Sequence, residues 1–244
     1  MKNTVLVCPV AYNENVKLRN VIERFLQSSM NGKADYLIVD DGSTDGTSEM
    51  IRSFASQGVA TIKHPMRTGV GAAIRTAIKY AAEKGYDVLV IMAGNDKDNP
   101  EEIPHLLLPI QDKGCEIVQG SRYLGGNRIG GDMPFYRKLA TKLHPFLLSL
   151  FVGRSVTDST NGFRAMKLSL FEDARINLEQ EWLNAYELEP YILFKSIRLG
   201  HSFCEAPVTK IYPAKTLGYT KMKPIVGWWS ILKPIFYLGF GIKK

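Results

Sequence analysis

The sequence predicts an α/β fold in which a mostly parallel sheet carries helices on both of its faces. Short apolar, β-branched runs alternate with segments whose apolar residues recur at helical spacing, and this alternation is typical of parallel sheets. One run, residues 87–92, is almost wholly apolar, as expected of a central strand that is buried on both faces. Several runs end in glycines and carboxylates, which favours tight turns into helices at one edge of the sheet.

The first half of the chain alternates regularly. Strands are predicted at residues 4–10, 36–39, 59–62, 87–92 and 115–120. Helices are predicted between them, because apolar residues recur at intervals of three and four in 16–26, 50–54 and 73–81, and a further helix begins at Pro100.

The second half carries fewer strands and longer helices. A glycine-rich loop at 124–133 precedes predicted helices at 135–152 and 187–199 and a strand at 203–208. The first of these helices has an apolar stripe for which the core is the preferred location and a membrane the alternative: Leu139, Leu143, Phe146, Leu147, Leu150 and Phe151.

Length and composition favour one globular domain in a reducing compartment. The 244 residues are 45% hydrophobic and 23% charged, ordinary values for such a domain. Cys8, Cys115 and Cys204 are widely spaced and form no Cys-x-x-Cys pair, which argues against a disulfide framework or a zinc site. We find no signal peptide and no apolar run of about 18 residues, so we expect a cytoplasmic protein without a transmembrane helix.

The net charge of +7 is concentrated toward the C-terminus. Between residues 201 and 244, seven lysines stand against one acid, Glu205. Such a segment suits phosphate groups or an anionic membrane surface. The sequence has no helix-turn-helix, RNP or zinc-finger signature, so we do not expect nucleic acid as a partner.

Polar side chains gather where the first two strands end. The second strand stops at Asp40 and Asp41, and Tyr12 and Glu14 follow the first. Because ligands of open α/β sheets bind at the carboxyl ends of the strands, we expect these residues to meet a substrate. A purely structural acidic loop that caps a helix is the alternative.

Four motifs in order resemble the inverting glycosyltransferases of family 2, which have the GT-A fold: YNE at 12–14, VDDGSTDGT at 39–47, GSRY at 120–123 and NGFR at 161–164. The resemblance is closest to the branch of dolichol-phosphate mannose synthase and other polyprenyl-phosphate glycosyltransferases. It covers most of the chain and implies a GT-A domain at 1–223, followed by an apolar and basic tail at 224–244.

The resemblance also implies how a nucleotide-diphosphate sugar binds. The family's nucleotide positions are matched here, although the family usually has proline where Val10 stands: Val10, Tyr12, Glu14, Val39 and Asp41. Gly71 opens a helix whose backbone N–H groups suit an anion, although a glycine-rich helix entry without a ligand is the alternative. Further expected contacts with the donor are Gly94, Lys97 and Lys221, with Arg67 and Arg75 as additional candidates.

The loop after residue 92 departs from the family. Relatives place Asp-x-Asp and then a glutamine there, whereas this chain has Ala93, Asn95 and Lys97. Mg²⁺ prefers anionic oxygens, and a nearby lysine repels it. We favour a metal ion, Mg²⁺ or Mn²⁺, that is retained at Asn95 with Asp96 or Asp98. In the alternative, Lys97 partly replaces the metal opposite the leaving diphosphate; a role of Asp98 as helix cap is compatible with both.

The expected catalytic residues are Asn95, Arg122, Asp158 and Glu187. Arg122 follows a strand, and an arginine there can grip phosphate oxygens. A polyprenyl-phosphate acceptor is already an anion and needs no general base, whereas a sugar hydroxyl requires a carboxylate from Asp158, Glu187 or Glu189. An ion pair of Asp158 with Arg164 is the structural alternative.

We therefore expect an inverting glycosyltransferase that works on a membrane-associated acceptor, peripherally on the cytoplasmic face. The alternatives are transfer to a glycan hydroxyl, a sugar-phosphate nucleotidylyltransferase, and a non-catalytic nucleotide-sugar-binding protein. The apolar stretch 225–238, with Trp228 and Trp229, suits a membrane interface, or else packs on its own domain or across a homodimer.

Overall fold

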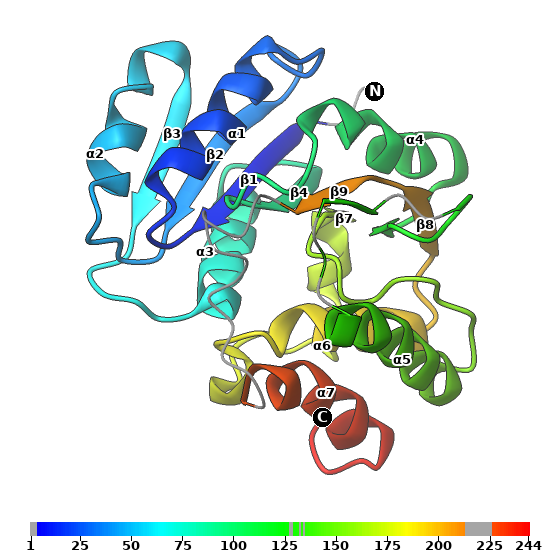
Figure 1. The fold of residues 1–244 in the computed structure, drawn as a ribbon. Helices are drawn as coiled ribbons and strands as arrows, with labels where there is room; N and C mark the ends of the chain where they lie inside the picture. The colour runs from blue at the N-terminus through cyan, green and yellow to red at the C-terminus, as the bar shows by residue number, and fades with distance from the viewer. Residues whose placement is uncertain (1–3, 127–128, 132, 134, 213–225) are drawn as a thin grey trace.

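A seven-stranded sheet forms the centre of the molecule (Figure 1). The structure is a computed structural model, and it describes residues 4–126, 129–131, 133, 135–212 and 226–244. The strands lie in the order β3-β2-β1-β4-β7-β5-β8. Their bounds are β1 (Val5–Ala11), β2 (Asp35–Asp40), β3 (Val59–Lys63), β4 (Val88–Ala93), β5 (Ile117–Ser121), β7 (Arg164–Lys167) and β8 (Phe203–Pro207). The predicted α/β fold with a mostly parallel sheet is confirmed.

Strand β7 runs antiparallel to both of its neighbours, β4 and β5. We predicted no strand here, because four residues are too few to show an alternating pattern. Since β7 is reversed, it begins at the edge where β4 and β5 end, and Arg164 pairs with Ile91 and Gln119. The segment before β7 therefore lies at the edge where β4 and β5 end, which is the edge that we expected to bind the substrate.

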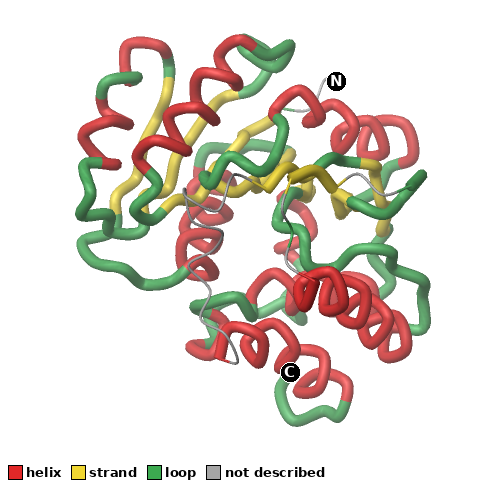
Figure 2. Tube along the Cα trace, in the orientation of Figure 1, coloured by secondary structure: helices red, strands yellow, loops and turns green. Residues whose placement is uncertain are grey.

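Helices cover both faces of the sheet, as Figure 2 shows. Their bounds are α1 (Asn15–Gln27), α2 (Thr47–Arg52), α3 (Val70–Glu83), α4 (Ile103–Lys113), α5 (Phe135–Val152), α6 (Leu188–Arg198) and α7 (Val226–Gly239). Successive side chains of a strand point to opposite faces, so β1 sends Val5 and Val7 into one core with α1, α2 and α4. The same strand sends Leu6 and Cys8 into a second core with α3, α5, α6 and α7.

Short 3-10 turns and a second, small sheet complete the fold. The turns are η1 (Ala55–Gln57), η2 (Pro100–Glu102), η3 (Leu168–Glu172) and η4 (Glu181–Leu183). Strands β6 (Ile129–Gly131) and β9 (Lys210–Tyr212) pair in parallel and form the second sheet. The pairing brings the glycine-rich loop beside the start of the basic C-terminal segment.

Helix α5 exposes most of the stripe that we expected in the core. Its buried face carries Leu148 and Val152, whereas four apolar residues of the stripe are between 47% and 63% exposed: Leu139, Leu143, Phe146 and Leu150. The preferred core interpretation is therefore wrong for these four residues, which we call the α5 stripe. Helical spacing shows that residues share a face, but it does not show which of two apolar faces meets the core.

Helix α7 packs on its own domain. Ile235 is fully buried in the core that it shares with Leu148, and Phe151 of α5 lies edge-on to the ring of Phe240. The ammonium group of Lys233 lies 2.6 Å from a carboxylate oxygen of Glu187. Trp229 and residues 240 and 242 remain more than half exposed. Within the described ranges, no helix is long and apolar enough to cross a membrane.

A disulfide joins Cys115 to Cys204, and Cys8 is a buried free thiol. The expectation that the cysteines form no disulfide is therefore wrong for this pair. The two residues are 89 positions apart in the sequence, and the pairing of β5 with β8 brings their Cα atoms to 6.1 Å. Only the order of the strands reveals this proximity, so cysteine spacing alone does not predict it.

The entry to α3 requires glycine because it packs on a neighbouring backbone. A Cβ atom at Gly71 would lie 2.1 Å from the carbonyl oxygen of Leu183, and one at Gly69 would lie 2.3 Å from that of Asn184. The N–H of Ala72 also donates to the Asn184 carbonyl at 3.1 Å. These contacts fix the loop 183–185 against the helix and explain the two glycines without a ligand.

We expect Gly71→Ala to lower the free energy of unfolding by about 1–3 kcal/mol, the usual cost of overpacking, although alanine is the better helix former. Urea unfolding under non-reducing conditions measures this difference. Gly130→Ala is the matched control, because a Cβ atom there lies no nearer than 3.6 Å to its neighbours. Equal stability of the two variants would contradict the packing argument.

Candidate active site

A cavity of about 350 Å³ opens where strands β1, β2, β4 and β5 end. Its lining also comes from α5, from the segment before β7 and from α7, so it joins parts that are far apart in the sequence. Eight of the residues that we expected to act lie on this lining: Val10, Tyr12, Glu14, Asp41, Gly94, Asn95, Lys97 and Arg122. Arg67 lies on it as well.

The other expected residues lie elsewhere. Val39 is buried in the core, Gly71 faces the backbone of residue 183, and Asp158 lies behind Arg122. Glu187 pairs with α7. Asp96 borders a separate surface pocket. Lys221 lies outside the residues that the structure describes.

The aromatic ring of Tyr12 forms one wall of the cavity. The guanidinium carbon of Arg67 lies 4.5 Å from the centre of this ring. Asn13 holds the turn in a left-handed conformation (φ 51°): its N–H donates to Ser43 Oγ, and its side-chain oxygen accepts from the N–H of Thr44. A flat ring with a cation above it is a suitable surface for stacking a nucleobase.

Asp41 organises the loop that carries Arg67. Its carboxylate accepts the N–H groups of Thr68 and Gly69, each at 2.8 Å, and lies 2.9 Å from His64 Nδ1. Burial would raise the pKa of Asp41, but the hydrogen bonds from Thr68, His64 and Gly69 lower it below its usual range. The carboxylate is thus ionised at neutral pH, and it holds the loop that carries Arg67 in place.

Asp40 has a different task from its neighbour. It is fully buried, and it accepts the N–H of Ser43 at 2.9 Å and the hydroxyl of Ser48. It therefore shapes the turn after β2, while Asp41 lines the cavity.

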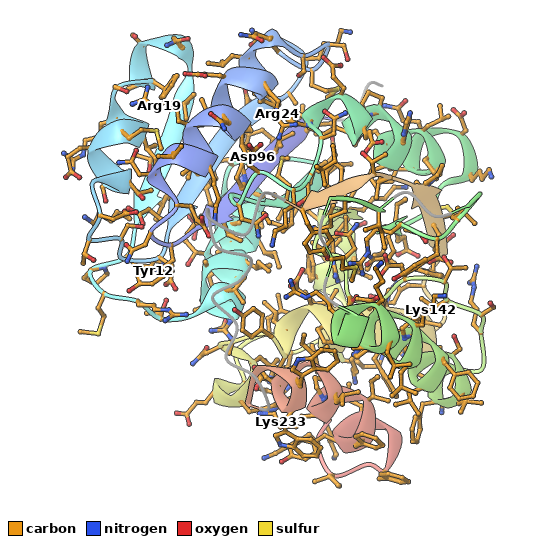
Figure 3. All side chains as sticks on the ribbon, viewed as in Figure 1. Tyr12, Arg19, Arg24, Asp96, Lys142 and Lys233 are labelled. Carbon is orange, nitrogen blue, oxygen red and sulfur yellow. A yellow bond between two sulfur atoms is a disulfide. The ribbon has the colours of Figure 1, made fainter. Side chains whose placement is uncertain are left out.

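The acids of the loop after β4 are engaged within the protein. Asp96 takes a left-handed conformation (φ 60°), and its carboxylate binds Asn20 and Arg24 of α1, where Figure 3 shows it beside Arg24. Asp98 is buried, accepts the N–H of Ala93 and lies 2.7 Å from the ammonium of Lys210. Asp98 therefore does not cap the following turn, a role taken by the side chain of Asn99.

Basic side chains surround the ring of Tyr212, which lines the cavity. Lys97 Nζ lies 5.0 Å and the guanidinium carbon of Arg137 5.7 Å from the ring centre, and Arg122 Nη1 is 3.3 Å from the phenol oxygen. Burial, followed by the positive charges of Lys210, Arg137 and Lys17, lowers the pKa of Lys97 to about 7. We call Lys97, Arg122, Arg137 and Lys210 the cation cluster.

Arg122 is held by a buried carboxylate. Its Nε and Nη2 atoms lie 2.6 and 2.7 Å from the two oxygens of Asp158, whose position is fixed in turn because Glu205 accepts its backbone N–H. Burial alone would lower the pKa of Arg122, but the charge of Asp158 raises it above its usual range. The structural alternative, an ion pair of Asp158 with Arg164, is therefore wrong: Asp158 pairs with Arg122.

The cavity lining contains one of the three candidate bases. Glu189 lies on the lining, and one of its oxygens is 3.4 Å from Arg164. His144 also lies there; it contacts Ser159 Oγ at 2.6 Å and the Ile231 carbonyl at 3.1 Å. Burial lowers the pKa of His144 to about 4, so this neutral ring ties α5, α7 and the segment before β7 together.

The residues at the family's metal position do not fit a divalent ion. Ala93 has no ligand atom, and Asp96 and Asp98 are bound to other groups. Asn95 lines the cavity, and its Oδ1 has no hydrogen-bond partner among the described residues, but it is a single neutral oxygen. No group of three or more histidine, cysteine or acidic side chains in the described part of the chain is arranged to hold a metal.

The protein has an α/β fold with a cavity where parallel strands end, which is where open sheets of this kind usually bind ligands. Residues 6–175 match the family described as "Glycosyl transferase family 2". The chain belongs to this family, and it is a glycosyltransferase.

Named relatives match most of the chain. It is 29% identical to the undecaprenyl-phosphate mannosyltransferase of Micrococcus luteus, over 89% of this chain and 87% of that protein. It is 30% identical to the UDP-N-acetylglucosamine–dolichyl-phosphate N-acetylglucosaminyltransferase of Methanococcus voltae, over 85% of both chains.

Solved structures share the fold. Glucosyl-3-phosphoglycerate synthase from Mycobacterium tuberculosis, in complex with Mn²⁺, UDP and phosphoglyceric acid, superposes with a TM-score of 0.70 at 18% identity. The match covers 99% of this chain and 80% of that one. GT-A proteins that hold a nucleotide with Mn²⁺ or Mg²⁺ are thus structural neighbours of this chain.

Our sequence analysis missed several lining residues. Arg137 and His144 lie on α5, where only the apolar stripe was considered, and Tyr212 lies on β9, where no strand was predicted. A basic residue directly after a glycine-rich loop is the one signal that pointed toward Arg137. Nothing local in the sequence predicts that α5 and α7 reach the cavity.

We expect Asp158→Asn to lower the free energy of unfolding by about 3–5 kcal/mol, because it leaves the buried Arg122 charge uncompensated. The double variant R122M/D158N is expected to lose less than the sum of the two single variants. Urea unfolding of all four proteins measures the coupling. If Asp158→Asn lowered the free energy of unfolding by less than about 1 kcal/mol, the pair would contribute no more than an exposed salt bridge, and the argument would be wrong.

Proposed function

We propose that the protein transfers a sugar from a nucleotide-diphosphate sugar to a polyprenyl phosphate at a membrane surface. The observation that carries this proposal is the mixed lining of the cavity. The lining combines Tyr12, Asp41 and the cation cluster with apolar residues of α5 and α7. An acceptor with an anionic head and an apolar chain matches both kinds of lining.

The apolar wall continues to the outside of the molecule. Ala140 and Leu143 of α5 line the cavity together with Trp228, Ile231 and Leu232 of α7. Leu143 also belongs to the exposed α5 stripe, so apolar surface runs from the cavity to the outer face of the helix. An isoprenoid chain can follow this path while its phosphate stays at the cation cluster.

The proposed transfer needs no general base. An oxygen of the acceptor phosphate attacks the anomeric carbon and forms the new C–O bond. The bond from that carbon to the diphosphate breaks, and the leaving diphosphate takes the electron pair, with inversion at the carbon. Lys97 and Arg137 of the cation cluster stabilise the negative charge that develops on the leaving group.

The α5 stripe is proposed to lie on the membrane. Its apolar residues are flanked on the same helix by the exposed Lys138 and Lys142, the latter labelled in Figure 3, and Trp229 is exposed on the adjacent α7. Apolar and aromatic groups beside lysines favour the interface of an anionic bilayer. We place the enzyme on the cytoplasmic face, where anionic lipids attract basic segments.

Transfer to a sugar hydroxyl is the second candidate function. The observation in its favour is Glu189, a carboxylate on the cavity lining. Its Oε1 lies 3.4 Å from Arg164 and accepts no hydrogen bond from the described residues. A hydroxyl acceptor requires a base of this kind. In that case Glu189→Gln abolishes transfer, whereas transfer to a phosphate acceptor does not depend on its charge.

A transfer assay tests the proposed reaction. The protein is incubated with radiolabelled GDP-mannose, UDP-glucose or UDP-N-acetylglucosamine and with undecaprenyl phosphate in detergent, and label in the lipid phase is counted. Tyr12→Ala is expected to reduce kcat/KM for the donor by about tenfold or more, as loss of one stacking surface does. Lys79→Ala, an exposed residue of α3, is the control. Absence of label from the lipid phase with all three donors would refute the lipid acceptor.

Vesicle flotation tests the membrane surface. The variant F146D/L150D changes two exposed residues of the α5 stripe that do not line the cavity. We expect it to lose binding to phosphatidylglycerol-containing vesicles but to keep activity on a short, water-soluble isoprenyl phosphate. Val16→Asp is the matched control, since Val16 is 64% exposed on α1. Unchanged flotation of F146D/L150D would exclude the stripe as the membrane contact.

A further inference from the structure

We infer that this glycosyltransferase binds the donor's diphosphate with the side-chain cations Lys97 and Arg137 in place of a divalent metal, so that donor binding and transfer do not depend on a metal. The inference rests on the proposed function, since it names how the same cavity holds its donor. It departs from the metal-containing complexes of the structural neighbours.

The first argument is the set of oxygen atoms near the end of β4. A hard divalent cation needs several anionic oxygens. This chain offers the neutral Oδ1 of Asn95, while Ala93 offers none. The carboxylates of Asp96 and Asp98 are bound by Arg24 and Lys210 and would have to abandon these pairs to reach a metal.

The second argument is the electrostatic environment of Lys97. Its side chain is 6% exposed and lines the cavity. Lys210, Arg137 and Lys17 all act on it as positive charges, and Asp98 acts against them. A metal ion placed in this neighbourhood would be repelled, whereas a diphosphate would be attracted.

The third argument is the arrangement around Tyr212. Lys97 and Arg137 both face this ring, at 5.0 and 5.7 Å from its centre, and the ring is held by Arg122 through its phenol oxygen. Burial and neighbouring cations lower the pKa of Lys97 to about 7, and a bound diphosphate favours its protonated form. The protonated lysine and the arginine together carry the formal charge of one divalent cation. Lys210 and Arg122 are anchored by Asp98 and Asp158, so they support this pair from fixed positions.

The phosphoryl oxygens that meet these cations belong either to the donor or to the acceptor. Nucleotide binding without any acceptor separates the two sources. The probes are UDP and GDP, each titrated calorimetrically into the protein in EDTA and again in Mn²⁺.

We expect the wild-type protein to bind UDP or GDP with a Kd that differs by less than about twofold between EDTA and Mn²⁺. Lys97→Gln is expected to weaken this binding by about tenfold to a hundredfold, as loss of a charge-assisted hydrogen bond does. Lys79→Gln is the matched control and keeps the wild-type affinity. Circular dichroism and thermal unfolding verify that both variants are folded.

The variant A93D/N95D/K97Q rebuilds the family's acidic pair and glutamine. We expect it to bind the same nucleotide only in Mn²⁺, which reverses the behaviour of the wild-type protein. This variant gains a property, so its result does not depend on interpreting a loss.

Three outcomes would overturn the inference. If Mn²⁺ raises the nucleotide affinity of the wild-type protein tenfold or more, the inference is wrong and the proposed transfer is unaffected. If Lys97→Gln binds the nucleotide as tightly as the wild-type protein does, the cations contact the acceptor phosphate and the inference is wrong as well. Absence of UDP and GDP binding in both conditions removes the inference together with the nucleotide-sugar donor of the proposed function.

Discussion

The buried pair of Arg122 and Asp158 is the interaction on which the centre of the cavity depends. It links the end of β5 to the segment before β7, and through Tyr212 it reaches β9. Glu205 of β8 holds the backbone of residues 157 and 158 from behind. A buried ion pair costs desolvation, and that cost is offset here by several hydrogen bonds in fixed directions. The result is a fixed frame for the cationic side chains of the cavity.

A second constraint comes from the backbone at the strand ends. Gly94 lets the end of β4 approach β1 closely, because a Cβ atom there would lie 2.9 Å from that of Ala11. Asp41 ties the loop at 64–69 to the end of β2. The positions of Tyr12 and Arg67 thus follow from short turns that are held by hydrogen bonds within the protein.

Much of the fold could be predicted from the sequence, because alternating apolar patterns and glycine-rich turns are local signals. The sequence also predicted the place of Tyr12, Asp41, Asn95, Lys97 and Arg122 at one edge of the sheet, because each lies within four residues after the end of a strand. Contacts between residues that are far apart in the sequence could not be predicted. The partner of Asp158, the outward turn of Asp96, the exposed side of α5 and the Cys115–Cys204 bond all depend on which elements become neighbours in space. Local periodicity carries no information about that choice.

The reversed direction of β7 has a consequence for how such enzymes diversify. The ends of β1, β2 and β4 bring Tyr12, Asp41 and Asn95 to the cavity, while the stretch that β7 brings in, together with α5 and α7, lines the rest of it. The cation cluster draws on both halves of the chain, because Lys97 follows β4 whereas Arg137 lies on α5 and Lys210 on β9. Under the proposed transfer, substitutions of the apolar residues of α5 and α7 can therefore change which molecule receives the sugar, provided that Arg137 is retained.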